Sequence, residues 1–314
     1  MSHCFGIKAS YFYVLCGWRT RSDIPLTSLP SSQGTSASVD VRIEIVPNPS
    51  PIGKSAARGV AKHTAEYSLI RINGVADFEI SEGRQIRVWP VTGTPQKDIE
   101  IFLFGPVWAT LCHQREILPL HASAIVTEGR ITAFAGHPGA GKSTTAALLG
   151  SFNYELMTDD ILPINLDPDS VPGAWPYLRR LKLRGDSINQ LGMTPVEQVS
   201  QLDSDKYFVL PKCAAADKWG SLERLYLLEI NPADSRVSIE KITGAEAVHA
   251  LVNYTYHFQF VLGSGRLGEH LSLCSQLASK ITVYRVQRPQ SFDGGRELGQ
   301  IICAHLNNAP GHQY

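Results

Sequence analysis

The segment that most constrains the fold of this chain extends from Gly136 to Ser143 and has the sequence Gly-His-Pro-Gly-Ala-Gly-Lys-Ser. It matches the pattern G-x-x-x-x-G-K-[ST] at every fixed position. In this pattern the glycines let the backbone curve until its N–H groups point at phosphate oxygens. Lys142 would place a positive charge on the β- and γ-phosphates, and the Ser143 hydroxyl would be a Mg²⁺ ligand. The segment therefore predicts a site for a nucleoside triphosphate with Mg²⁺.

The residues on either side of this segment agree with that prediction. Residues 130–135 have the pattern of a short buried strand, and residues 143–149 have that of a helix. Such a helix directs its N-terminus at the phosphates. The alternative is a glycine-rich turn that matches by chance, and the strand and helix favour the functional interpretation. We expect ATP to be bound by Gly136, His137, Pro138, Gly139, Ala140, Gly141, Lys142, Ser143 and Thr144.

Length, charge and cysteine content limit the class of protein. The 314 residues are enough for two modest domains, and the formal net charge is zero with a pI of about 7.1. No global charge directs the chain to nucleic acid or to an acidic membrane. The six cysteines have no Cys-x-x-Cys spacing and no zinc-site spacing. We therefore expect a reduced, cytoplasmic protein with no nucleic-acid or membrane partner.

The first hundred residues predict a β-rich domain. Residues 9–18 could resemble the core of a signal peptide, but they are aromatic-rich and lack a cleavage site, so a strand is expected. Residues 25–38 are polar and turn-prone, which predicts an exposed loop. Apolar and polar residues alternate in four further segments, and each is expected to be a strand: 39–46, 67–72, 76–80 and 85–90.

The rest of the chain has the pattern of an α/β fold. Apolar residues recur at helical spacing from Ile101 to Gln114, which predicts a connecting helix over 101–117. From Leu118 to the end, at 314, strands and helices alternate, as in a nucleotide-binding core. Besides those around the glycine-rich segment, the expected strands are 225–230 and 282–286, and the expected helices are 245–253, 267–281 and 294–306.

Two acidic residues could supply chemistry to a bound nucleotide. Residues 155–160 predict a short strand that ends in the paired carboxylates Asp159 and Asp160. One carboxylate can hold Mg²⁺, and the other can accept the proton of an attacking hydroxyl. A solvated turn is the alternative interpretation. His121, at the start of an expected strand, is a weaker candidate, because a lone histidine in that position is usually structural.

A basic stretch follows the acidic pair. Arg179, Arg180, Lys182 and Arg184 are interrupted only by leucines. In an extended chain, alternation would place Arg180, Lys182 and Arg184 on one face. Such a row could neutralise nucleotide phosphates, bind an acidic peptide, or simply be a solvated surface. Other positively charged or imidazole side chains are weaker candidates (Lys206 and Lys212) or are expected to be structural (His249, His257 and His270).

Together, three segments resemble a known family. Leu118-Pro-Leu-His-Ala-Ser-Ala, Gly-Ala-Gly-Lys-Ser-Thr and Thr-Asp-Asp-Ile-Leu-Pro are similar to the catalytic core of HPr serine kinase/phosphorylase. The longer match is closest to the HPr-kinase-like proteins that modify precursor peptides, including the lasso-peptide tailoring kinases. The residues around Ser22 and Ala76 also resemble the N-terminal domain of that subgroup. The resemblance covers most of the chain and is most specific over 118–163.

The resemblance implies a P-loop kinase core of the HPr kinase and phosphoenolpyruvate carboxykinase type, with a smaller β-rich N-terminal domain. It implies that Asp160 is the base for a seryl hydroxyl and that Asp159 and Ser143 lie at the metal. It also implies that His121 lies near the transferred phosphate and that Lys142 acts on it. Which aspartate has which role stays open.

The chain also departs from the family pattern. The later glutamate–arginine–glycine signature of HPr kinase has no clear copy, so neither phosphorylase activity nor HPr as substrate is expected. The leading hypothesis is phosphoryl transfer from ATP to a serine of a peptide or protein. A non-catalytic ATP-binding regulatory protein and a small-molecule kinase are the alternatives. Whether the chain forms a homo-oligomer is left open by the sequence.

Overall fold

The computed structural model describes residues 10–32, 38–47, 49–51, 59–167, 169–200, 203–231, 236–289 and 293–308. The chain divides into two compact units. The first contains residues up to Glu116 together with Gln259–Arg266, and the second contains Ile117–Phe258 and the residues from Leu267 onward. The predicted connecting helix thus belongs to the first unit, and so does a short segment from the second half of the chain.

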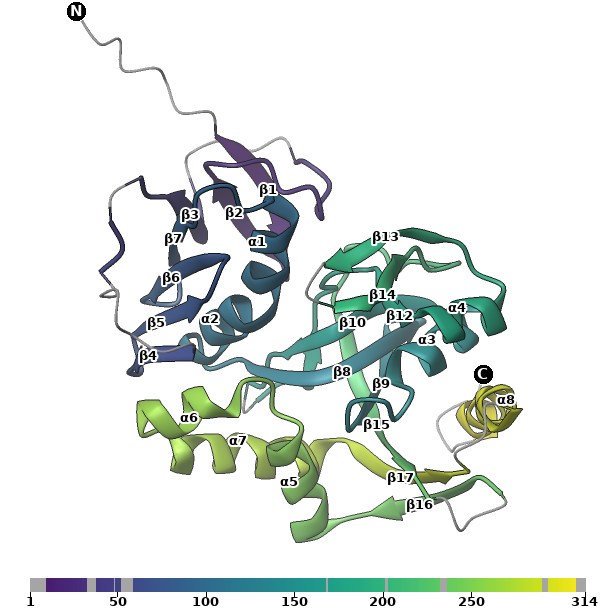
Figure 1. Cartoon of the computed structure of the whole chain (residues 1–314). Helices are drawn as coiled ribbons and strands as arrows, with labels where there is room; N and C mark the ends of the chain where they lie inside the picture. The colour runs from purple at the N-terminus through teal and green to yellow at the C-terminus, as the bar shows by residue number, and fades with distance from the viewer. Residues whose placement is uncertain are drawn as a thin grey trace, which may run out of the picture. The chain divides into compact units, whose positions relative to one another are not determined.

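A seven-stranded sheet forms the first unit (Figure 1). Its spatial order is β1-β2-β3-β7-β6-β5-β4; β2–β3 and β3–β7 are parallel pairs and the rest are antiparallel. The strands are β1 (Tyr11–Leu15), β2 (Trp18–Ser22), β3 (Val41–Ile45), β4 (Gly59–His63), β5 (Tyr67–Ile72), β6 (Ala76–Ser81) and β7 (Gln85–Pro90). The predicted strand over 9–18 is, within the described residues, β1 and the turn into β2; Ala9 lies outside them.

The predicted helix over Ile101–Gln114 begins earlier and is interrupted. It consists of α1 (Gln96–Phe102), a π-helical turn η1 (Leu103–Val107) and α2 (Trp108–Gln114). Gly105 leaves the helical conformation, and the next residue is Pro106, which cannot donate to the helical ladder. Trp108 and Leu111 are fully buried, α2 packs on β6 of this unit, and the Trp108 ring stacks on that of Trp18 in β2.

The predicted exposed loop over 25–38 is only partly exposed. Leu26 is 2% exposed, so the loop contributes to the core. The buried carboxylate of Glu100 accepts hydrogen bonds from the backbone and hydroxyl groups of Thr27 and Ser28. A charged acceptor therefore fixes residues that polarity alone assigned to solvent. Residues 33–37 of the predicted loop lie outside the described residues.

The second unit is built on a mixed sheet with the order β10-β8-β9-β15-β17-β16. The β9–β15 and β15–β17 pairs are parallel, as in an α/β fold. Its strands are β8 (Leu118–Thr127), β9 (Arg130–Gly136), β10 (Glu155–Ile164), β15 (Gly220–Ile230), β16 (Ser238–Ile242) and β17 (Thr282–Arg288), and the two-residue β11 (Gly173–Ala174) pairs with β15.

Helices cover both faces of this sheet, which makes three layers (Figure 1). One apolar cluster joins the sheet to α5 and α7, and the other joins it to α3 and α8. Successive side chains of β9 point to opposite faces of the sheet, so Ala133 and Ala135 belong to the first cluster and Phe134 to the second. The helices are α3 (Lys142–Gly150), α5 (Gly244–Asn253), α7 (Leu267–Lys280) and α8 (Asp293–Asn308), while α6 (Phe258–Ser264) lies mostly in the first unit.

A small antiparallel sheet completes the second unit. Its order is β12-β14-β13, and none of its strands is among those predicted from the sequence. Short α4 follows the first of these strands. The bounds are β12 (Leu181–Arg184), α4 (Gly185–Leu191), β13 (Pro195–Ser200) and β14 (Asp203–Val209).

Candidate functional site

The glycine-rich segment connects the end of β9 to the start of α3. Gly136 has φ +155°, and a Cβ atom there would lie 2.6 Å from the carbonyl oxygen of Leu228 on the neighbouring strand. Only glycine allows this approach. The turn is closed by the N–H of Ala140, which donates to the carbonyl of His137 at 3.0 Å.

The start of α3 offers backbone donors and one cation. Among the described residues, no side chain caps this helix. Its first N–H groups have no partner within the helix and suit an anion. Lys142 donates from Nζ to the carbonyl of Gly136 at 2.8 Å. Burial lowers the pKa of Lys142, and the neighbouring Asp160 and Asp159 oppose that shift.

A cavity of about 540 Å³ brings most of the predicted site residues together. Among the predicted residues, those that line it are His121, Pro138, Gly139, Gly141, Lys142, Ser143, Thr144, Asp159, Asp160 and Lys182. Four of the predicted residues are not among the lining residues: Gly136, His137, Ala140 and Arg180. The first three form the turn itself. The acidic pair therefore faces the same space as the glycine-rich segment.

Asp159 and Asp160 lie inside β10 and not at its end, so the predicted short strand is corrected. The strand continues to Ile164, which pairs with Leu118 of β8. Because β8 is equally long, it provides ladder partners for Ile161 and Leu162 as well. The carboxylates are consequently fixed by a regular antiparallel pair.

Asp159 is 6% exposed and is surrounded by neutral donors. Its Oδ1 accepts from the hydroxyl of Ser123, and its Oδ2 accepts from the backbone N–H of Lys182, both at 2.6 Å. The hydroxyl of Ser143 also interacts with this carboxylate. Burial raises the pKa of Asp159 to about 6, and these hydrogen bonds counteract part of the rise.

Asp160 lies beside an ammonium group and an imidazole instead. Its Oδ2 accepts from Nζ of Lys182 at 2.6 Å, and its Oδ1 lies 3.4 Å from Nδ1 of His121. Burial alone would raise the pKa of Asp160, but Lys182 and His121 hold it well below its usual range. The imidazole of His121 is further fixed by the ring of Tyr256, with centroids 5.1 Å apart. Asp160 is therefore ionised at neutral pH, and Asp159 takes up a proton at a higher pH than Asp160 does.

The predicted basic row is divided by the start of β12. Lys182 and Arg184 alternate with buried Leu181 and Leu183 and line the cavity. Arg180 precedes the strand, and its guanidinium lies 3.7 Å from the ring centroid of Phe208. Arg179 turns away toward Asp217, at 2.6 Å. Two of the three cations expected on one face thus reach the cavity.

Two further cations line the cavity. Arg288, at the end of β17, donates from Nε and Nη2 to the carbonyl of Ala140 at 3.1 and 3.0 Å. Arg288 is not among the residues predicted from the sequence, and no local motif identifies it, because only the parallel pairing of β15 with β17 brings it near the loop. Lys206 pairs in register with Arg184 and also lines the cavity, whereas Lys212 is exposed outside it.

The donor set suits a hard cation. Ser143, Asp159 and Asp160 supply a hydroxyl and two carboxylates to one cavity. Within the described residues, no group of three His, Cys, Asp or Glu side chains could by itself hold a metal ion. Mg²⁺ usually keeps several waters and binds through one or two carboxylates and substrate phosphates, so no such group is required.

The histidines expected to be structural lie away from this cavity. His270 contacts the hydroxyl of Thr255 and the thiol of Cys274 inside the unit, and His249 contacts Asn253. Burial lowers the pKa of His257 and of His270, which favours their neutral forms.

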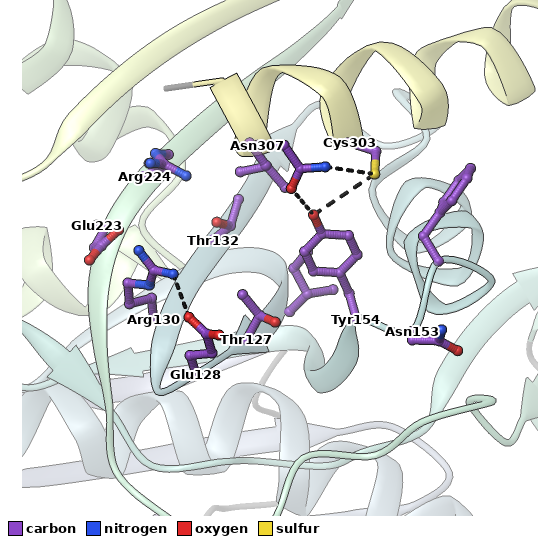
Figure 2. A pocket seen from close by; sticks show the side chains of 13 residues that line it. Thr127, Glu128, Arg130, Thr132, Asn153, Tyr154, Glu223, Arg224, Cys303 and Asn307 are labelled. Carbon is purple, nitrogen blue, oxygen red and sulfur yellow. Dashed lines mark hydrogen bonds and ion pairs between the residues drawn. The ribbon is translucent and has the colours of Figure 1, made fainter. Parts of the chain in front are cut away.

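A second cavity, of about 430 Å³, lies at the other end of β9 (Figure 2). It includes Arg130 and Thr132 of that strand, and Arg130 pairs with Glu128 at 2.8 Å. Figure 2 also shows the hydroxyl of Tyr154 directed at Asn307 and Cys303 of α8. None of the predicted site residues lines it.

Comparison with known proteins finds distant structural neighbours among solved structures. No family model matches the chain, and no curated protein matches it. The structure of the HPr(Ser) kinase/phosphatase from Coxiella burnetii is 10% identical, covers 62% of this chain and 99% of its own, and has a TM-score of 0.33. A likeness at this level assigns neither a family nor an activity. In the part of the chain that the structure describes, no helix has the length and apolar character needed to cross a membrane.

Proposed function

We propose that this chain is an ATP-dependent serine kinase with a P-loop core of the HPr kinase type. The observation that supports it is the shared cavity, in which Asp159 and Asp160 face Lys142 and Ser143 of the glycine-rich segment. Phosphoryl transfer requires positioned phosphates, a metal and an acceptor for a hydroxyl proton, and these residues can provide all three.

In the proposed reaction, a seryl oxygen bonds to the γ-phosphorus of ATP while the bond to the β,γ-bridging oxygen breaks, and ADP leaves. The main-chain donors at the start of α3 and Lys142 hold the phosphates. Asp160 orients the hydroxyl and takes its proton; its carboxylate is ionised, as this role requires, although its lowered pKa makes it a weak base. His121 lies beside Asp160 and near the transferred group.

Ser143 and Asp159 are the proposed Mg²⁺ ligands. When bound, Mg²⁺ would neutralise charge on the phosphate oxygens. The ion would also favour ionised Asp159, whose burial otherwise favours the protonated form. Ser123 and the backbone of Lys182 hold the carboxylate in place for this role.

The finer assignments extend the sequence resemblance. We propose that residues 118–314 form the catalytic domain, of the phosphoenolpyruvate carboxykinase-like type, and that residues 1–100 form a separate β-rich domain. We further propose a cytoplasmic enzyme whose substrate is a ribosomal precursor peptide, as in lasso-peptide tailoring. The similarity of residues 118–163 to the tailoring kinases supports this choice.

Two variants test the proposal with purified protein, ATP–Mg²⁺ and serine-containing precursor peptides. The expected product is a peptide one phosphate heavier by mass spectrometry. Asp160→Asn should lower kcat by about 10²- to 10⁴-fold while nucleotide binding is retained. Lys142→Ala should weaken nucleotide binding by about 10- to 100-fold, the loss of one charge-assisted contact.

Asp217→Asn is the matched control, because Asp217 is an exposed aspartate paired with Arg179 outside the cavity. Full activity in Asp160→Asn would refute the proposed base. ATP binding without transfer to any acceptor would favour a regulatory nucleotide-binding protein, and transfer only to small alcohols would favour a small-molecule kinase.

A further inference from the structure

Lys182 contacts both members of the acidic pair. Its backbone N–H donates to Oδ2 of Asp159 and its Nζ donates to Oδ2 of Asp160, each at 2.6 Å. The side chains of Lys182 and Asp160 are 23% and 19% exposed, so the ion pair is shielded from solvent. Such pairs are screened little by salt and keep their geometry.

The two carboxylates differ in the charge of their partners. Asp160 has Lys182 on one oxygen and His121 on the other. Asp159 has a hydroxyl on one oxygen and a backbone N–H on the other. Each oxygen of an ionised carboxylate offers about two acceptor positions, so Asp159 keeps positions for a further ligand. The Ser143 hydroxyl interacts with the same carboxylate.

This asymmetry bears on how many metal ions the site can hold. Two-metal sites place their ions about 3.5–4 Å apart between shared ligands. A second divalent cation beside Asp160 would have to displace the Lys182 ammonium or lie next to it, and like charges at that separation repel strongly. The hydrogen-bond donors on the two oxygens of Asp159 are instead a hydroxyl and a backbone N–H, and the nearby Lys142 ammonium acts on both aspartates.

We propose that the Lys182 ammonium takes the place of a second metal ion beside Asp160, so that the site holds one divalent cation, for which Asp159 and Ser143 would be the ligands. This inference rests on the proposed nucleotide site. It assigns Lys182 as a positioning residue whose charge sets the metal stoichiometry.

The test is the number of Mn²⁺ ions bound per chain, measured by equilibrium dialysis of the full chain with adenylyl imidodiphosphate and Mn²⁺ on both sides. We expect one ion for the unchanged protein. Lys182→Glu exchanges the ammonium for a carboxylate and should bind two. Asp160→Asn should retain the single ion, whereas Asp159→Asn should lose it. Lys212→Glu makes the same charge change at an exposed position outside the cavity and should stay at one.

A count other than one for the unchanged protein overturns the inference. It is also overturned if Lys182→Glu binds one ion although its circular dichroism and thermal melting match the unchanged protein. The same dialysis measures retained nucleotide. Absence of bound nucleotide contradicts the proposed function as well, whereas bound nucleotide with two ions contradicts the role of Lys182 alone.

Discussion

At the scale of single residues, Asp159 and Asp160 are adjacent in one strand yet have pKa shifts of opposite sign. Burial raises the pKa of Asp159 to about 6, and Lys182 and His121 lower that of Asp160. Where a folded-state pKa is raised, the native state binds more protons than the unfolded chain, and stability falls as pH rises through that range. Where a folded-state pKa is lowered, the ionised group stabilises the folded state. This stabilisation is complete above the pKa of the unfolded chain and is lost only at more acid pH.

We therefore predict that Asp159→Asn becomes more stable relative to the unchanged protein between pH 4 and pH 7. The rise from 3.8 to about 6 corresponds to about 3 kcal/mol across that range. Urea unfolding at several pH values, followed by tryptophan fluorescence, measures the difference. Asp217→Asn, at an exposed aspartate outside the cavity, is the control, and its difference in unfolding free energy from the unchanged protein should be constant from pH 5 to pH 7. If the unfolding free energies of Asp159→Asn and the unchanged protein differ by the same amount at every pH, the pKa of Asp159 is not raised in the folded protein.

Arg288 provides a second prediction at this scale. Its guanidinium donates two hydrogen bonds to the Ala140 carbonyl and so holds the glycine-rich turn. Lysine keeps the charge but not the planar fork. Arg288→Lys should weaken binding of a fluorescent ATP analogue about tenfold, the effect of about 1.4 kcal/mol. Arg285→Lys is the matched control on the same strand, because Arg285 pairs with Glu229 and Glu246 and does not line the cavity. Equal affinities for the two variants would argue against a role for Arg288.

At the scale of elements, the turn between β9 and α3 depends on the space around Gly136. A Cβ atom there would lie 2.6 Å from the Leu228 carbonyl oxygen and 2.9 Å from Cβ of Ala140. Gly136→Ala should lower the free energy of unfolding by about 2 kcal/mol or more and abolish nucleotide binding. At Gly139 a new Cβ would meet no atom within 4 Å, and the φ of +87° is the only unfavourable feature for alanine. Gly139→Ala should therefore lower the free energy of unfolding by only about 1–2 kcal/mol. Thermal melting and nucleotide titration measure how much more Gly136→Ala loses than Gly139→Ala. Equal losses would mean that β15 moves away from β9 to make room for the new Cβ atom.

The elements that sequence could predict are those whose signals are local. The strand, turn and helix around residues 130–150 are continuous in the chain, and so are the alternating strands β5 to β7. The end of β10 could not be placed, because its length is set by β8, which lies on the far side of the glycine-rich segment. The sheet β12-β14-β13 was missed, because a strand of only four residues lies within a basic stretch. From the sequence, Lys182 is a candidate to bind nucleotide phosphates. Its contact with Asp160 could not be predicted, because it depends on the position of β12 beside β10.

At the scale of the whole molecule, the two units are not two consecutive halves of the chain. Residues Gln259–Arg266 belong to the first unit, although more than a hundred residues separate them from the rest of it. Arg266 pairs with Glu116 at 3.0 Å. The Phe260 side chain is 1% exposed, and its ring lies 5.2 Å from that of His63 and 5.0 Å from that of His113. Sequence patterns could not place α6 there, because amphipathic spacing identifies a buried face but not the surface that buries it.

The core of the first unit should therefore depend on a side chain from the second half of the chain. Phe260→Ala removes a fully buried ring and should lower the free energy of unfolding of this unit by about 3–5 kcal/mol. Trp18, Trp89 and Trp108 lie in the first unit and Trp175 and Trp219 in the second, so urea unfolding followed by tryptophan fluorescence reports on both units, and the transition that shifts in the variant is the one to compare. Leu262→Ala, on the same helix but 58% exposed, is the control and should change stability by no more than about 0.5 kcal/mol. Equal stability of the two variants would mean that the Phe260 ring contributes nothing to the core of the first unit.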